Sequence, residues 1–270
     1  MDTNNVTTKM YLSLLKKALT ASLYEESGWQ IKRPSGKRHI KNVFLKYFMK
    51  KSLLLIKAKK FDESARENGM DWPMFGYTMA GLRRLDNVEF CVDDVLKNNI
   101  PGDFIETGAW RGGTTIFMRA LLKVHGVTDR TVWVADSFEG LPVPKGEDDG
   151  SDLSQVDYLK VSLEQVQPNF KKFDLLDEQV RFLKGWFCDT LPDAPIDEIS
   201  ILRLDGDLHS STMDALESLY CKVSKGGYVI VDDYLTWPAC RRVVTDFLTE
   251  NALDPEIIRI DDSGAYWKVL

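Results

Sequence analysis

Two pairs of aspartates lie near the C-terminal end of the sequence, Asp205-Gly206-Asp207 and Asp232-Asp233. Each pair follows a short apolar run, at 199–204 and 227–231, which is typical of a buried parallel strand. The carboxylates therefore fall at the C-terminal ends of two strands, the edge where open α/β sheets bind ligands. Converging carboxylates repel one another, so they either share protons or bind a hard divalent cation through oxygen. A single aspartate there usually serves a turn, but two clusters on successive strands favour a metal site.

A glycine-rich turn earlier in the chain is the second candidate for chemistry. The stretch 103–115 reads as a strand, a turn and a helix start, and such a turn lets a cofactor approach the backbone. It has neither the GxGxxG spacing of dinucleotide sites nor the lysine of a phosphate-binding loop. Its acidic residue would repel a pyrophosphate but suits S-adenosylmethionine, which carries an ammonium and a sulfonium. The candidate contacts are Glu106, Thr107, Gly108 and Arg111, with helix capping or pairing to Arg111 as the alternative role of Glu106.

Residues after the next two strands extend this candidate cofactor site. Asp136 and Ser137 end the strand that follows the glycine turn, where an acid binds ribose hydroxyls in nucleotide-binding folds. Trp186 and Phe187 follow a third strand and are placed to cover an adenine ring, although aromatic residues there are as often ordinary core. The long polar loop 136–157 is expected to be a lid at the same edge of the sheet.

Strand-like and helix-like segments alternate from residue 102 onward, which predicts a parallel sheet covered by helices. Strands are expected at 103–107, 131–136, 180–185, 200–205, 228–232, 256–260 and 265–269. Helices are expected at 113–124, 154–171, 211–223 and 238–250. The turn 261–264 joins the last two strands, so the fold class is α/β, with seven strands and an antiparallel last strand, as in the Rossmann-like class I methyltransferase sheet.

The first part of the chain, 1–101, is expected to be a helical appendage packed on the cofactor-binding domain 102–270. Two segments carry apolar residues at helical spacing. In 10–24 they are Leu12, Leu15, Leu19 and Leu23, and in 82–96 they are Leu85, Val88, Val92 and Val95.

Charge is distributed unevenly along the 270 residues. The formal net charge is −6, yet the segment 29–60 contains eleven Lys or Arg and no acid. With its interleaved aromatic residues it suits contact with anionic lipid or a polyanion, while a solvated face or a subunit contact is the more common outcome. No nucleic-acid partner is expected. Cysteines without CxxC spacing indicate free thiols, and the apolar stretch 52–56 is too short to span a membrane, so a cytoplasmic location is expected.

Several phrases of the sequence, in order, resemble the macrocin O-methyltransferase family. They are Thr78–Asn87, Gly102–Gly113, Trp133–Pro142, Asp189–Pro192, Leu204–Asp207 and Val231–Tyr234. The resemblance extends from about residue 11 to residue 270. It implies an S-adenosylmethionine- and Mg²⁺-dependent O-methyltransferase, usually oligomeric, that acts on a hydroxyl of a deoxysugar or related glycoside.

The resemblance also implies roles for particular residues. Asp205, Asp232 and Asp233 match the family's metal ligands, and Asp207 matches its general base. Glu106 and the Gly108 turn match the cofactor loop, and Asp136 and Ser137 match the segment near the ribose and adenine. Asp205 is also expected to contact the cofactor. His209 departs from the tyrosine of many relatives and is a second candidate base, because imidazole titrates near neutral pH.

Two other functions remain open at this point. A catechol-type O-methyltransferase uses a similar metal arrangement on the same fold, and the family resemblance favours the sugar hydroxyl over it. A non-catalytic scaffold that binds an anionic partner through 29–60 is the alternative from another class. The acceptor sugar, and whether it belongs to a natural product, a lipid or a polysaccharide, does not follow from these residues.

Overall fold

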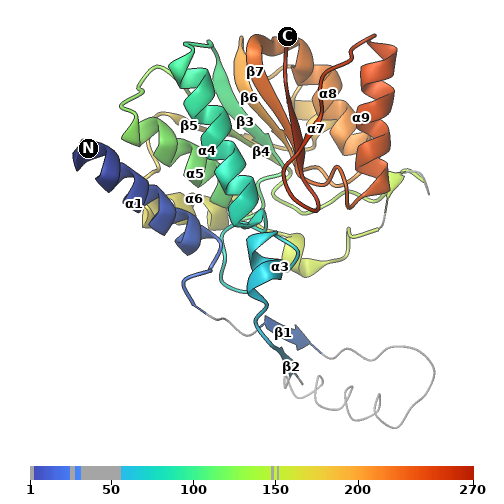
Figure 1. Ribbon diagram of the computed structural model, residues 1–270. Helices are drawn as coiled ribbons and strands as arrows, with labels where there is room; N and C mark the ends of the chain where they lie inside the picture. Colours follow the sequence, from blue (N-terminus) through green and yellow to red (C-terminus); the bar gives the residue numbers. More distant parts are fainter. Residues whose placement is uncertain (1–2, 25–27, 32–55, 147–148, 151) are drawn as a thin grey trace, which may run out of the picture.

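The computed structural model describes residues 3–24, 28–31, 56–146, 149–150 and 152–270. Its main sheet has seven strands in the order β5-β4-β3-β6-β7-β9-β8 (Figure 1). The parallel strands are β3 (Asp103–Thr107), β4 (Val132–Asp136), β5 (Val180–Lys184), β6 (Ile199–Leu204) and β7 (Val223–Val231). The strand β9 (Ala265–Lys268) pairs antiparallel with β7, and β8 (Ile258–Arg259) pairs antiparallel with β9. The predicted seven-stranded sheet with an antiparallel last strand is confirmed.

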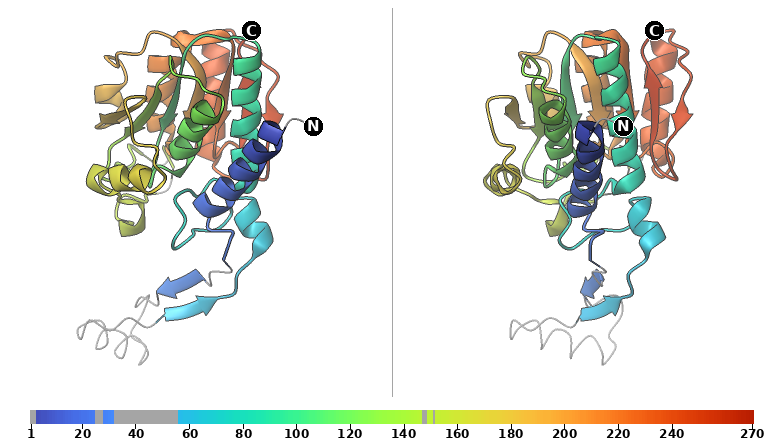
Figure 2. Two further views of the ribbon diagram at one scale, coloured as in Figure 1. Left: turned by 90° about the vertical axis from the view of Figure 1, so that its left-hand side faces the viewer. Right: turned by 60° about the vertical axis from the view of Figure 1, so that its left-hand side comes forward.

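Helices cover both faces of this sheet, which makes three layers (Figure 2). On one face lie α1 (Thr3–Leu19), α4 (Gly81–Lys97), α5 (Gly113–Val124) and α6 (Leu163–Lys172), and on the other lie α8 (His209–Leu219) and α9 (Pro238–Glu250). Every residue of β6 is buried, and its side chains alternate between the faces. Ile201 belongs to the core under α4 and α5, whereas Leu202 belongs to the core under α8 and α9.

The N-terminal helices α1 and α4 pack into the hydrophobic core on one face of the sheet. The predicted stripe of α4 is fully buried, and Leu12, Leu15 and Leu19 of α1 are buried with it. Leu23 is 42% exposed, contrary to its prediction as part of the stripe. The reason is that α1 ends at Leu19 and Ala21 has a left-handed backbone, with φ 55°, which redirects the chain. The division of the chain at residue 101 stays a prediction.

Several elements differ from those expected. The helix predicted over 154–171 is a 3₁₀ turn, η2 (Asp157–Leu159), followed by α6, because Ser162 and Gln165 form a capping box that begins the helix at Leu163. A second 3₁₀ turn, η3 (Tyr220–Lys222), follows α8. Two short helices, α3 (Glu63–Glu67) and α7 (Phe187–Thr190), were not predicted. Neither was the hairpin of β1 (Gly28–Ile31) and β2 (Ile56–Lys59), which stands apart from the main body in Figure 1.

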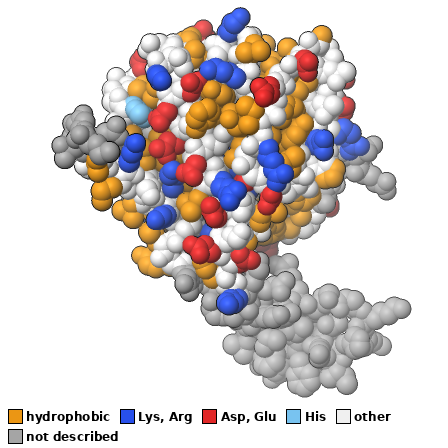
Figure 3. Space-filling model, in the orientation of Figure 1, with side chains coloured by type: hydrophobic (Ala, Val, Ile, Leu, Met, Phe, Trp, Pro, Cys, Tyr) orange, Lys and Arg blue, Asp and Glu red, His pale blue; other side chains and the backbone are white. Residues whose placement is uncertain are grey.

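Most of the basic segment 29–60, residues 32–55, lies outside the described residues, and its predicted contact with anionic partners stays a prediction. On the face drawn in Figure 3, acidic and basic side chains are interspersed rather than separated by sign. Among the described residues, no helix is both long and apolar enough to cross a membrane.

Candidate active site

A cavity opens at the C-terminal ends of β3, β4 and β6. Of the predicted site residues, those that line it are Gly108, Asp136, Ser137, Trp186, Phe187, Asp205 and Asp207. They come from separate parts of the sequence, and the parallel sheet brings them together because these strands end at the same edge. The structure therefore assembles the glycine turn and the first aspartate cluster around one space.

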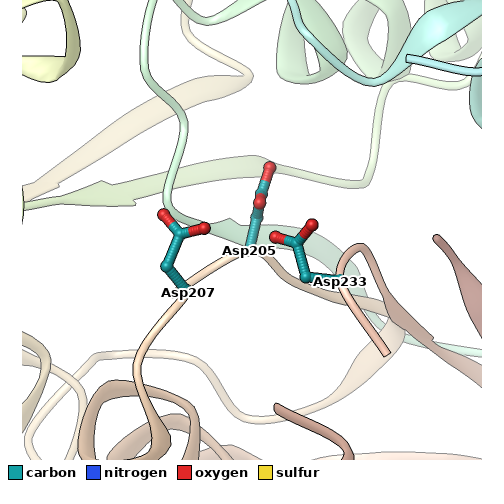
Figure 4. A group of neighbouring side chains, drawn as sticks. All are labelled: Asp205, Asp207 and Asp233. Atoms are coloured by element: carbon teal, nitrogen blue, oxygen red, sulfur yellow. The ribbon is translucent and has the colours of Figure 1, made fainter. Parts of the chain in front are cut away.

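Three carboxylates converge beside this cavity. Oxygen atoms of Asp205, Asp207 and Asp233 lie within 4.8 Å of one another, and their side chains turn toward a common point (Figure 4). Burial, and then the charge of Asp233, raises the pKa of Asp207 well above its usual range. Burial, and then the charge of Asp232, raises the pKa of Asp205 well above its usual range and that of Asp233 to about 6. The cluster thus has an excess of negative charge that a proton or a cation would relieve.

Asp232 was predicted to be a metal ligand, but in the structure its side chain is paired with two arginines. It is 5% exposed, and its two carboxylate oxygens form ion pairs with Arg84 and Arg203. Arg84 also donates to Asp261 at 2.9 Å and so connects α4, the end of β7 and the turn before β9. Asp232 is not in the group of converging oxygens. Its role as a metal ligand stays a prediction.

Arg203 is the centre of a buried ion-pair network. Its guanidinium, 1% exposed, contacts Glu106, Asp205 at 2.8 Å, and Asp232. Arg203 therefore joins the ends of three strands, β3, β6 and β7, through their carboxylates. Glu106 is 1% exposed and does not line the cavity, because its side chain is turned into the sheet toward Arg203. Its alternative pairing with Arg111 is not the one observed.

Three further candidates also lie outside the cavity lining. Thr107 is buried in β3, where its hydroxyl donates to the Arg203 carbonyl at 3.4 Å. Arg111 donates to the carbonyls of Met74 and Gly76 at 2.9 and 2.8 Å. His209 begins α8 with its Nε2 3.7 Å from a carboxylate oxygen of Asp246 on α9. Of the two candidate bases, Asp207 lines the cavity and His209 does not.

Asp136 lines the cavity but is already engaged by backbone donors. One carboxylate oxygen accepts the N–H groups of Ala109 and Trp110 at 2.8 and 3.1 Å, and the other accepts the N–H of Phe138 at 2.7 Å. Burial raises the pKa of Asp136, and these backbone donors oppose that rise. Asp136 thus fixes the shape of the glycine turn, a role that sequence reasoning missed. Its predicted ribose contact is untested.

The glycine turn passes close to the backbone of Asp205 at Gly108. The φ of Gly108 is 95°, and a Cβ placed on it would lie 1.8 Å from the carbonyl oxygen of Asp205. The residue is therefore required to be glycine, both for its backbone conformation and for this close approach.

We expect Gly108→Ala to weaken S-adenosylmethionine binding by about tenfold or more, since the turn must move away from Asp205 and the strain is on the order of 1–3 kcal/mol. Calorimetric titration with the cofactor measures the loss. Gly146→Ala is the matched control, because a Cβ there meets no atom within 4 Å. An affinity for Gly108→Ala within about twofold of the unmodified protein would contradict this account.

The loop predicted as a lid forms one wall of the cavity. Gly140, Leu141, Pro142 and Lys145 line it, and Asp149 fastens the loop to α8. One Asp149 oxygen accepts the Ser210 N–H at 2.6 Å, and the other accepts the Ser210 hydroxyl at 2.9 Å. The sequence did not single out several lining residues, namely Met79, Trp110, Leu159, Ser210, Ser211 and Asp214. For Ser210 and Ser211 the only signal was their position just after Asp207.

Comparison with known proteins gives consistent matches over nearly the whole chain. The family model for macrocin O-methyltransferase (TylF) matches residues 8–269. The demethyldecarbamoylnovobiocin O-methyltransferase of Streptomyces niveus is 44% identical over 270 residues, covering 98% of this chain and 95% of that protein. The 8-demethyl-8-(2,3-dimethoxy-alpha-L-rhamnosyl)-tetracenomycin-C 4'-O-methyltransferase of Streptomyces olivaceus is 44% identical, covering 96% of this chain and 92% of that protein.

The fold agrees with these matches. The solved structure of the O-methyltransferase NovP is similar with a TM-score of 0.81 and 45% identity, covering 97% of this chain and 99% of that one. This likeness includes both the sheet and the helices that precede it.

Proposed function

The chain belongs to the macrocin O-methyltransferase family and is an O-methyltransferase, and we propose that it methylates a sugar hydroxyl of a glycosylated natural product or glycan, using S-adenosylmethionine and Mg²⁺. The observation that best supports this is the group of three carboxylates beside the cavity of the glycine turn. One relative described above is named for O-methylation of demethyldecarbamoylnovobiocin, and the other for O-methylation of a tetracenomycin that carries a rhamnosyl group.

The carboxylate cluster fits a hard divalent cation. Asp205, Asp207 and Asp233 offer only oxygen, the donor that Mg²⁺ prefers, and their pKa values are raised first by burial and then by mutual repulsion, which a cation would relieve. Asp205 and Asp233 belong both to this group and to the ligand set implied by the family resemblance, so we assign the ion to them first. Bound there, it would make an acceptor hydroxyl more acidic.

Asp207 is assigned as the general base. Its carboxylate lines the cavity and adjoins Asp233, so a hydroxyl held at the cluster is within reach of it. Asp207 would accept the proton of the acceptor hydroxyl, and the cofactor would supply the methyl group that replaces it on the oxygen. Burial raises the pKa of Asp207, which makes its carboxylate a stronger base than a solvated one.

The glycine turn and its neighbours are assigned to the cofactor, whose sulfonium supplies a methyl group with a good leaving group. Gly108 allows close approach to the backbone, and Ser137 and Trp186 line the same cavity further along. Asp136 holds the turn in shape through its backbone contacts. The chain contributes mostly by positioning, because a displacement with a good leaving group gains most when the reacting atoms are held in line.

Metal removal is the direct test of the cation. Treatment with EDTA is expected to lower turnover of a glycoside acceptor by at least about 10²-fold, and Mg²⁺ is expected to restore it, because the hydroxyl would otherwise ionise beside uncompensated carboxylates. Turnover that is the same with EDTA and with Mg²⁺ would rule the metal out. Cofactor binding measured in parallel separates loss of the ion from loss of the cofactor site.

The two alternatives make different predictions. A catechol-type enzyme would methylate catechols in preference to glycosides, and a scaffold would not bind S-adenosylmethionine. The carboxylates that match the family's metal ligands are all present in the sequence, which favours an enzyme over a scaffold. An oligomeric state and contact of 29–60 with a lipid-linked substrate stay predictions.

A further inference from the structure

An aromatic ladder runs from the cavity to the protein surface. Trp110 lines the cavity, and its ring centroid lies 5.2 Å from that of Tyr158. Tyr158 in turn stacks on Trp72, with 5.3 Å between the ring centroids and an interplanar angle of 4°. Trp72 is 53% exposed, although a large aromatic side chain normally gains by being buried. Tyr158 precedes Leu159, which also lines the cavity. The ladder is thus continuous with the candidate active site.

The ladder is held in place by contacts to the backbone of the loop 72–76. The Tyr158 hydroxyl donates to the carbonyl of Pro73, and the Trp110 indole N–H donates to the carbonyl of Tyr158 at 2.9 Å. Arg111 lies over the rings of Trp110 and Tyr158, at 4.1 and 5.3 Å from their centroids, while it donates to carbonyls of the same loop. The exposed Trp72 ring stacks on Tyr158, which is fixed in this way, so the stack loses little conformational entropy when a ligand binds.

The chemistry of the ladder limits what it can recognise. Three polar groups at its inner end, the Tyr158 hydroxyl, the Trp110 indole N–H and Arg111 Nη1, each donate to a backbone carbonyl. The surface that the ladder offers to a ligand is therefore mainly the exposed ring of Trp72. Ring faces favour a flat, uncharged group over a phosphate or a polyanion.

We propose that Trp72 and Tyr158 form a specificity platform that binds a flat, aromatic aglycone while its sugar enters the cavity. The proposal rests on the proposed function and deepens it, since it assigns the acceptor to glycosides of flat aromatic compounds rather than to a polysaccharide. The distinct observation is the exposure of Trp72 in a ring stack anchored at the cavity.

The test compares two probes that carry the same sugar, 4-methylumbelliferyl α-L-rhamnoside and methyl α-L-rhamnoside. Binding of each is measured by calorimetry in the presence of S-adenosylhomocysteine and Mg²⁺. The unmodified protein is expected to bind the aryl glycoside tighter by on the order of tenfold, the effect of adding one stacked ring and its buried area. Trp72→Ala is expected to reduce this preference to within about twofold, and Trp72→Phe, which keeps a ring, is expected to retain most of it.

Phe90→Ala is the matched control, because Phe90 is 51% exposed and lies on α4, where it contacts Tyr228 and Tyr266. It is expected to leave the preference unchanged. No preference in the unmodified protein, including no detectable binding of either probe, would overturn the platform, as would an unchanged preference in Trp72→Ala. The proposed function fails separately, if no sugar hydroxyl is methylated in a screen of glycosides, because the preference is measured without turnover.

Discussion

Replacing Asp207 by asparagine is expected to lower kcat by about 10²- to 10⁴-fold, the usual contribution of a general base. The amide is nearly the same size as the carboxylate but does not accept the proton of the acceptor hydroxyl. Asp207 has a left-handed backbone, with φ 58°, a conformation that asparagine adopts readily and alanine does not. Asparagine therefore removes the base without disturbing the turn after β6.

The stability of Asp207→Asn provides an independent check. Asp207 lies among carboxylates whose pKa values are raised by burial and mutual repulsion, so loss of one charge is expected to leave the melting temperature unchanged or higher. Glu217→Gln on the exposed side of α8 is the matched control and is expected to keep full turnover. A metal affinity that falls together with kcat would reassign Asp207 from base to ligand. Turnover within about threefold of the unmodified enzyme would remove it from the mechanism.

Arg203→Met is expected to have the largest effect on stability, a loss of about 3–5 kcal/mol, as found when one partner of a buried ion pair is removed. Arg203 is 1% exposed and contacts Glu106, Asp205 and Asp232 at once. Without its guanidinium, Glu106 is left buried without its cation, and Asp232 keeps only Arg84. The melting temperature is expected to fall by roughly 10 °C for a chain of this size.

Two variants sharpen this test. Arg181→Met removes an exposed arginine from β5 and is expected to change stability by less than about 0.5 kcal/mol. Arg203→Lys keeps a charge but not the planar fork that reaches several carboxylates, so its melting temperature is expected to lie between those of the methionine variant and the unmodified protein. If Arg203→Met melted like Arg181→Met, the network would contribute no stability.

The succession of strands and helices along the chain was predictable, because each element has its own local sequence pattern. Short apolar runs marked β3 to β6 to within about one residue, and the stripe of α4 is buried as its spacing indicated. The elements that differ from the prediction have identifiable structural causes. The capping box at Ser162 shortens the predicted helix 154–171, and β1 pairs with β2 across the intervening segment 32–55, so this pairing is not a local signal.

The sequence by itself determined that the two aspartate clusters, 205–207 and 232–233, would lie at one edge of the sheet near a glycine turn, since the ends of parallel strands share that edge. Only the tertiary structure decided which carboxylates converge and which are paired. Arg84 reaches Asp232 from a helix 148 residues earlier, and Arg203 turns Glu106 away from the cavity. The physical reason is that the end of a strand fixes the position of a residue's backbone. The direction of its carboxylate depends on buried cations that no local pattern specifies.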